Sequence, residues 1–308
     1  MMLDGLFLLI GFSLLIFGAN ILIEGGVGIS RKYKISQSIV GLTIVAAGTS
    51  APEYAVSFIG ALSDKGNISI GNIVGSNILN IGFVLGLISM ISVMKIKAGE
   101  IRQDILFLIL TSIFLLLFVT DYEISHSEGF IFLGGFLLYI YFCYKRRKAP
   151  VEEILPRSKS MKISRIILYI TGGIVGLFLG GKLTVDSSIK IARYLSVSET
   201  VISLSIVALG TSLPEFITSI MAVSKKHSKL SLGNIIGSNI FNILFCLGSS
   251  ASIINLKVDF DDIRLDIYFM LLLTVLLFPA IKGNRIRRWH GLLFFALYVL
   301  YVIYLYAH

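Results

Sequence analysis

Charged residues are scarce in this sequence. Only 15% of its 308 residues are Asp, Glu, Lys or Arg, whereas 56% are hydrophobic and the mean hydropathy is +0.88. Because a soluble domain carries about 25% charged residues, the composition excludes an ordinary cytosolic enzyme, a disordered chain and a nucleic-acid-binding protein. The net charge of +9 does not change this, since no basic face remains once the apolar stretches are set aside. The sequence is that of a polytopic protein of the lipid bilayer.

Cysteine and N-terminal basic residues are also rare. The two cysteines, Cys143 and Cys246, both lie in apolar stretches, so no disulfide framework is indicated. No Lys or Arg precedes Arg31, and Asp4 lies near the start, which makes this end a poor signal peptide. Residues 3–23 are therefore predicted to form the first membrane span.

The apolar stretches predict an all-α membrane protein with ten spans, because about 20 apolar residues cross a bilayer as a helix. They lie near 3–23, 39–63, 68–93, 105–120, 129–143, 165–185, 201–224, 230–255, 266–281 and 291–306. The polar segment 144–164 is the one linker. It divides the chain into halves of five spans each, residues 1–143 and 165–308.

Basic residues are distributed unequally between the two sides of this predicted bundle. Of the 27 Lys and Arg residues, 21 fall on the side that holds segment 144–164, and six fall on the side of the termini. The positive-inside rule then predicts a cytoplasmic linker and extracellular termini in a cell membrane.

The two halves carry one repeated motif. A shift of 162 residues aligns 43–80 with 205–242 without a gap, with 18 of 38 positions identical. GTSAPE falls on GTSLPE, and GNIVGSNILN falls on GNIIGSNIFN. Because each half has an odd number of predicted spans, the two copies are expected to cross the membrane in opposite directions. Inverted repeats of this kind are typical of secondary transporters, whose site lies near the membrane midplane.

Each motif places one carboxylate, Glu53 or Glu215, near the middle of a span. An unpaired carboxylate at this depth costs several kcal/mol, and no Lys or Arg lies in the middle of any predicted span. The two glutamates are therefore expected to share a mobile cation, bind protons or face water. Two protonated glutamates in a purely structural core are the remaining possibility.

The neighbouring residues favour a hard cation. Pro52 and Pro214 remove a backbone N–H each and are expected to free carbonyl groups at membrane depth. Hydroxyl groups lie on the same helix face as each glutamate, and a second stripe follows at i, i+4, i+8 on the next span. These side chains are Thr49, Ser50, Thr211 and Ser212, then Asn72, Ser76, Asn80, Asn234, Ser238 and Asn242. Oxygen donors without His or Cys favour calcium, sodium or magnesium over zinc or copper.

With these motifs, the sequence resembles the calcium/cation antiporter superfamily, and within it the potassium-independent, prokaryotic type of sodium/calcium exchanger. The two motifs, at 43–80 and 205–242, are similar to that family's two alpha-repeats. The resemblance implies a core of spans 2, 3, 7 and 8 around the cation sites, with spans 1 and 6 sliding across it.

The resemblance also implies the ligands and the activity. Calcium and sodium would be bound as transported ions, with no cofactor, and about three sodium ions would exchange for one calcium ion. The implied ligands are Glu53, Glu215, Thr49, Ser50, Ser76, Thr211, Ser212 and Ser238, the carbonyls of Ala46 and Ala208, and the amides of Asn80 and Asn242. Asn242 departs from the aspartate that potassium-dependent exchangers and some archaeal relatives carry.

Other functions remain open at this point. A proton/calcium exchanger on the same fold is the first alternative. A cation channel with a charged constriction at Glu53 and Glu215 is the second, and a membrane enzyme would need a catalytic cluster that the four histidines do not form. The linker is too short to fold a regulatory module, and no obligate protein partner is indicated.

Overall fold

The computed structural model describes residues 2–96, 98–148, 161–195 and 208–307. Eight described helices are long and apolar enough to cross a membrane, or nine if one bent pair counts as a single span. The predicted start of the seventh span, residues 201–207, lies outside the described residues. Most of the predicted linker, residues 149–160, does so too.

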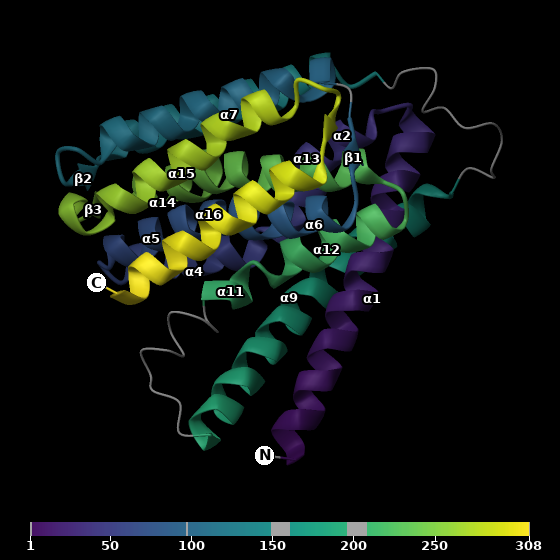
Figure 1. The fold of residues 1–308 in the computed structure, drawn as a ribbon, viewed down its shortest axis with the longest axis horizontal. Helices are drawn as coiled ribbons and strands as arrows, with labels where there is room; N and C mark the ends of the chain where they lie inside the picture. The colour runs from purple at the N-terminus through teal and green to yellow at the C-terminus, as the bar shows by residue number, and fades with distance from the viewer. Residues whose placement is uncertain (1, 97, 149–160, 196–207, 308) are drawn as a thin grey trace.

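Two long helices form a separate arm of the fold (Figure 1). Helices α1 (Met2–Tyr33) and α9 (Ile163–Tyr194) have 32 residues each and extend together beyond the other helices. They are antiparallel: Gly11 lies against Thr184, and Gly25 against Ile170. A Cβ at Gly18 would lie 2.8 Å from the backbone nitrogen of Leu177, so only glycine allows this close packing. The predicted spans 3–23 and 165–185 were too short, because both helices continue beyond the apolar stretch, to Tyr33 and Tyr194.

The second predicted span is broken. It comprises α2 (Gln37–Val40), the π-helical turn η1 (Gly41–Val45), α3 (Ala46–Thr49) and α4 (Ala51–Leu62). The axis bends by 51° between α3 and α4. The seventh span shows the corresponding break between α11 (Ala208–Thr211) and α12 (Leu213–Ser224).

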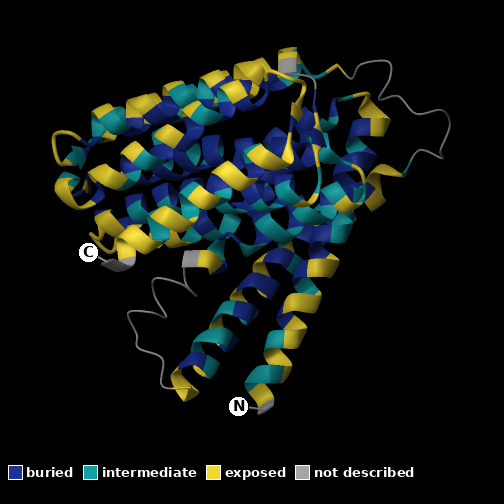
Figure 2. Ribbon diagram, in the orientation of Figure 1, coloured by how far each residue is buried: buried dark blue, intermediate teal, exposed yellow. Residues whose placement is uncertain are grey.

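The third and eighth spans lie at the centre and are the most buried helices (Figure 2). The third comprises α5 (Gly66–Leu79), η2 (Asn80–Leu85) and α6 (Gly86–Ile91). The eighth comprises α13 (Ser228–Phe241), η5 (Asn242–Leu247) and α14 (Gly248–Ile253). A Cβ at Gly237 would lie 2.5 Å from the carbonyl oxygen of Leu42, so this glycine lets α13 approach η1.

Four further helices cover this centre. They are α7 (Ala98–Phe118), α8 (His126–Lys145), α15 (Phe260–Ala280) and α16 (Arg288–Ala307). Two short antiparallel pairs join their connecting loops: β1 (Met94–Lys95) with β4 (Arg285–Ile286), and β2 (Glu123–Ile124) with β3 (Leu256–Lys257).

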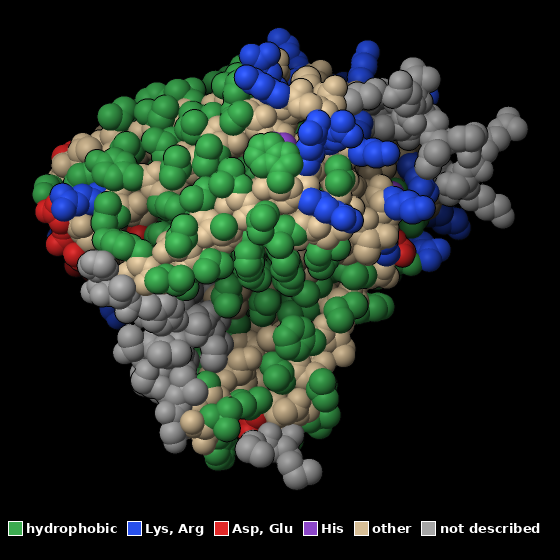
Figure 3. Space-filling view, in the orientation of Figure 1, with side chains coloured by type: hydrophobic (Ala, Val, Ile, Leu, Met, Phe, Trp, Pro, Cys, Tyr) green, Lys and Arg blue, Asp and Glu red, His purple; other side chains and the backbone are tan. Residues whose placement is uncertain are grey.

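The charged side chains gather at opposite ends of the bundle (Figure 3). Lys and Arg concentrate around α2 and β1, whereas acidic side chains lie around β2 and β3. At the basic end, His227 Nδ1 donates a hydrogen bond to Gln37 Oε1 over 3.0 Å. Burial, with Arg31 and Lys225 nearby, lowers the pKa of His227 below its usual value, so we expect it to be neutral at neutral pH.

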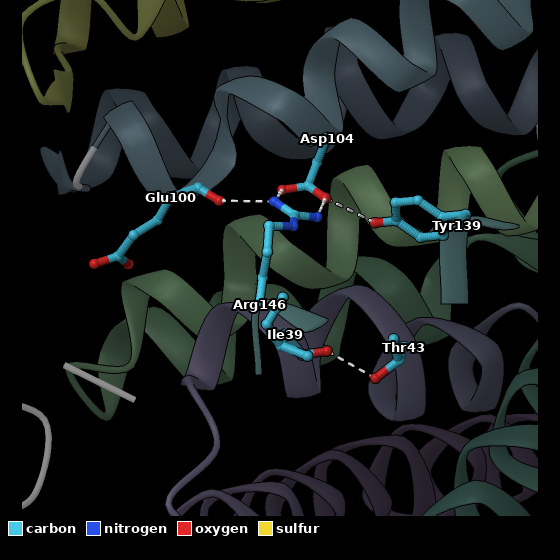
Figure 4. Close-up of polar contacts among 6 residues, drawn as sticks. All are labelled: Ile39, Thr43, Glu100, Asp104, Tyr139 and Arg146. Carbon is cyan, nitrogen blue, oxygen red and sulfur yellow. Dashed lines mark hydrogen bonds and ion pairs between the residues drawn. The ribbon is translucent and has the colours of Figure 1, made fainter. Parts of the chain in front are cut away.

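A buried ion pair fixes the start of the linker at this same end (Figure 4). The Arg146 guanidinium donates to both carboxylate oxygens of Asp104, at 2.6 and 3.1 Å, and Asp104 is completely buried. Tyr139 donates to the same carboxylate at 3.2 Å. One residue further along the chain, the Arg147 carbonyl accepts from the Ser36 backbone nitrogen, so the linker is tied to the turn between α1 and α2.

This ion pair predicts a stability difference between single and double variants. Arg146→Met leaves the Asp104 carboxylate buried without its counter-charge, so we expect a loss of about 3–5 kcal/mol in the free energy of unfolding. Arg146→Met combined with Asp104→Leu removes both charges and should recover most of that loss. Thermal unfolding in detergent measures both. A double variant as unstable as Arg146→Met would contradict the electrostatic explanation.

Candidate functional site

The two helix breaks place Glu53 and Glu215 in equivalent positions. Ser50, between α3 and α4, has φ −82° and ψ 9°, and Ser212, before α12, has φ −91° and ψ 7°. A proline follows two residues later in each case, and each glutamate lies in the first turn of the new helix. The positive end of the helix dipole therefore acts on each carboxylate. Pro52 was expected to interrupt the span, and the break is confirmed.

Each broken span holds the carboxylate of the other. Ser50 Oγ donates to Glu215 Oε1 at 2.9 Å, and Ser212 Oγ donates to Glu53 Oε1 at 3.0 Å. All four side chains are completely buried. The repeated motifs, 162 residues apart, therefore meet at one point inside the bundle.

Neither carboxylate has a basic partner among the described residues. Oε2 of Glu53 and Oε2 of Glu215 are both buried without a hydrogen-bond donor. A buried carboxylate loses its hydration, and a lone buried negative charge costs several kcal/mol. The negative charge of the two carboxylates is therefore not compensated by the described residues, and a bound cation could neutralise it.

The surrounding donors are oxygen atoms of hydroxyl and amide groups. In the described part of the chain, no three His, Cys, Asp or Glu side chains lie close enough together to hold a metal ion. Two carboxylates with hydroxyl and amide oxygens make a set that suits calcium or sodium rather than a transition metal.

Thr49, at the end of α3 in the first half of the chain, closes the site on one side by its contacts with α13. Thr49 Oγ1 donates to Asn234 Oδ1 at 3.1 Å and lies 3.4 Å from Ser238 Oγ. Ser238 Oγ in turn lies 3.4 Å from Glu215 Oε1. Helices α3 and α13 are thereby joined directly beside the carboxylates.

The equivalent residue of the second half, Thr211, lies in different surroundings. Its Oγ1 is buried without a partner among the described residues. Thr211 lines a cavity of about 330 Å³ between α4, α9 and α11. Other residues in its wall are Pro52, Val56, Phe178, Lys182, Asp186 and Gly210. The site is thus closed next to Thr49 and adjoins a cavity next to Thr211.

The remaining predicted residues lie on the same elements. The Ala46 carbonyl accepts from the Ser50 backbone nitrogen at 3.0 Å and from Thr49 Oγ1 at 3.3 Å. Ala208 is the first described residue of α11. Ser76 is buried on α5, and Asn80 and Asn242 begin the π-helical turns η2 and η5.

Sequence reasoning missed two buried asparagines, Asn77 and Asn239. They join α5 to α13 by reciprocal hydrogen bonds, in which each Nδ2 donates to the other's backbone carbonyl at 3.2 Å. Both belong to the repeated GSN sequence, so the repeat itself contained the signal. They lie outside the i, i+4, i+8 stripe, and a search limited to that stripe leaves them out.

Polar stripe residues Asn72 and Asn234 support the broken helices instead of facing the carboxylates. Asn72 Nδ2 donates to Ser57 Oγ at 2.9 Å and to the Glu53 carbonyl at 3.1 Å. Asn234 Nδ2 donates to Ser219 Oγ at 3.1 Å. Each amide therefore holds its neighbouring helix, α4 or α12, in place.

Comparisons with known proteins agree with this geometry. The family model described as sodium/calcium exchanger protein matches residues 4–145 and 165–307. The chain is 34% identical over 296 residues to the putative antiporter CaxA of Alkalimonas amylolytica, covering 94% of this chain and 93% of the relative. It is 28% identical over 343 residues to the sodium/calcium exchanger MaX1 of Methanosarcina acetivorans, covering 98% of both.

The fold also matches solved structures. A structure of the sodium-calcium exchanger NCX_Mj soaked with sodium and calcium aligns with a TM-score of 0.86 at 32% identity, over 98% of both chains. Another, soaked without either ion, aligns with a TM-score of 0.87. Members of this family are exchangers and not enzymes. The chain is therefore a multi-pass helical membrane antiporter that belongs to the sodium/calcium exchanger family.

Proposed function

We propose that this chain exchanges sodium for calcium by alternating access, with about three sodium ions for each calcium ion. The observation that carries the proposal is the buried carboxylate pair, whose Oε2 atoms have no donor and no basic partner among the described residues. Two negative charges match one calcium ion or about two sodium ions. The relatives MaX1 and NCX_Mj are sodium/calcium exchangers, which supports the same pair of ions.

The proposed ligands surround that pair. Glu53 and Glu215 supply the charge and bind calcium or sodium at different stages of the cycle. Neutral oxygens complete the coordination, from Thr49, Ser50, Ser76, Thr211, Ser212, Ser238, Asn80 and Asn242 and from the carbonyls of Ala46 and Ala208. The ions are cargo, and no resident cofactor is required.

Coupling follows from the use of one set of ligands for both ions. Calcium and sodium need the same two carboxylates, so occupancy by one excludes the other. An empty pair of carboxylates would retain two uncompensated charges at the centre of the bilayer, which opposes any movement of the unloaded site across the membrane. Each transit therefore requires cargo, and this makes the protein an exchanger instead of a channel.

We further propose ten spans in two inverted repeats, with extracellular termini and a cytoplasmic linker at 144–164. The antiparallel pairing of α1 with α9 and the reciprocal bonds of Ser50 and Ser212 support the inversion. The concentration of Lys and Arg at the α2 end supports the orientation.

The unequal surroundings of Thr49 and Thr211 support alternating access. In an inverted repeat, equivalent residues face opposite sides of the membrane. Thr49 is bonded to α13, whereas Thr211 adjoins the cavity between α4, α9 and α11. With the proposed orientation, the cavity beside Thr211 is the proposed extracellular entrance, and the Thr49 contacts are the proposed closure on the cytoplasmic side.

Calcium uptake into proteoliposomes tests the coupling ion. We expect an outward sodium gradient to drive uptake of radioactive calcium, and Glu53→Gln and Glu215→Gln each to abolish it, because either change removes half of the site charge. Asp121→Asn, a carboxyl-to-amide change at an exposed position, is the control and should transport normally. Near-normal uptake in either glutamate variant would contradict the proposed site. Uptake driven only by an outward proton gradient would establish proton/calcium exchange in its place.

Membrane voltage tests the stoichiometry. Three sodium ions leaving for one calcium ion entering carry one net positive charge out of the vesicle. Calcium uptake should therefore rise with an inside-positive potential and fall with an inside-negative one, as set by a potassium gradient with valinomycin. A rate that does not respond to voltage would indicate two sodium ions for each calcium ion.

Substitution at position 242 tests whether this residue contacts the cargo. Asn242 Nδ2 donates to Asn77 Oδ1 at 3.1 Å, and an ionised carboxylate cannot donate. We expect Asn242→Asp to make uptake pH-dependent and to change the preference between sodium and calcium, as measured by uptake across a pH series. Asn67→Asp, at an exposed position, is the matched control. The same profile as wild type would mean that position 242 is not a ligand.

A further inference from the structure

Four asparagine side chains form a closed network where the two central spans cross. Asn77 and Asn239 each donate to the other's backbone carbonyl at 3.2 Å. Asn80 Nδ2 donates to Asn239 Oδ1 at 3.0 Å, and Asn242 Nδ2 donates to Asn77 Oδ1 at 3.1 Å. All four side chains are completely buried, so water does not compete for these bonds.

The backbone bonds determine which way every amide in this network is turned. A backbone carbonyl can only accept, so the group that Asn77 presents to Asn239 must be its NH₂. The oxygen of Asn77 consequently faces Asn242, and Asn242 must present its own NH₂ to that oxygen. The same reasoning on the other side makes Asn80 present its NH₂ to Asn239.

The amide oxygens of Asn80 and Asn242 are thereby directed away from the network. Oδ1 of Asn80 is buried without a donor in the described part of the chain. Oδ1 of Asn242 has a long contact of 3.9 Å with the Cys246 thiol. Asn242 lies one helical turn beyond Ser238, whose hydroxyl contacts Glu215, so both lie on the helix face toward the carboxylates.

We propose that Asn77 and Asn239 are positioning residues that orient the amides of Asn242 and Asn80, so that these present only oxygen to the transported cation. The inference rests on the proposed function, because it needs a cation beside Glu53 and Glu215. Without the network an amide can turn over, and its NH₂ would then repel the cation. Asn77 acts through Asn242, and Asn239 acts through Asn80.

A double-mutant cycle separates this role from simple stabilisation of the helix crossing. Equilibrium binding of radioactive calcium to the purified protein in detergent gives Kd, and thermal unfolding gives Tm. We expect Asn77→Ala to raise Kd about tenfold. In an Asn242→Ala background the same change should have little further effect on Kd, whereas in an Asn80→Ala background its effect should persist.

Two variants complete the design. Ser112→Ala removes a buried hydroxyl bonded to the Leu108 carbonyl in α7, away from the site, and should leave Kd unchanged. Asn77→Leu is the alternative if Asn77→Ala does not fold, since leucine nearly fills the volume of the side chain but can neither donate nor accept a hydrogen bond. We expect Asn77→Leu to raise Kd by about the same factor as Asn77→Ala.

The outcomes distinguish a failure of the proposed function from a failure of the positioning role alone. A wild-type protein that binds no calcium would overturn both the proposed function and this inference. Calcium binding in wild type that is lost in Glu53→Gln, together with unchanged Kd in Asn77→Ala, would overturn the inference alone. An equal loss from Asn77→Ala in all three backgrounds would also overturn it, because it would assign Asn77 a purely structural role.

Discussion

The central constraint on this structure is that two carboxylates lie deep in the bundle, with no fixed counter-charge in the described part of the chain. Ser50 and Ser212 hold one oxygen of each carboxylate, and the other oxygen remains without a donor among the described residues. A hydroxyl bond stabilises a carboxylate but does not neutralise it. The broken helices, the polar central spans and the close packing at Gly237 all bring neutral oxygens to this point, where a mobile cation can balance the charge.

In the proposed alternating-access mechanism, the long α1–α9 arm is the element that would move. The cavity beside Thr211 lies between this arm and the broken helices, and α9 contributes Phe178 and Lys182 to its wall. The contact between α1 and α9 is close, as at Gly18, so the two helices can move as one body. Movement of that body over the fixed core would close one side and open the other without disturbing the carboxylates.

Much of this arrangement could be predicted from the sequence, because two copies of one motif reveal both its location and its partner. Glu53, Glu215 and their serines were identified from spacing, and Pro52 indicated the helix break. Other features depend on tertiary contacts and could not be predicted. The π-helical turns that begin at Asn80 and Asn242 have no local sequence signal. The excess length of α1 and α9 lies in turns with charged residues, such as Arg31 and Arg193, which an apolar window excludes. Asn77 was missed although it belongs to the repeated motif, because it lies outside the i, i+4, i+8 stripe of polar residues.

The asparagine network shows why neutral ligands in a membrane site need support of their own. A carboxylate is the same from either side, whereas an amide offers oxygen in one orientation and NH₂ in the other. In a site that must bind ions and release them, charge alone would hold calcium too strongly and would not discriminate by geometry. Neutral oxygens lower the net charge of the coordination shell, but only if their orientation is set before the cation arrives. In this structure the backbone carbonyls of residues 77 and 239 set that orientation, and both carbonyls belong to the central helices α5 and α13.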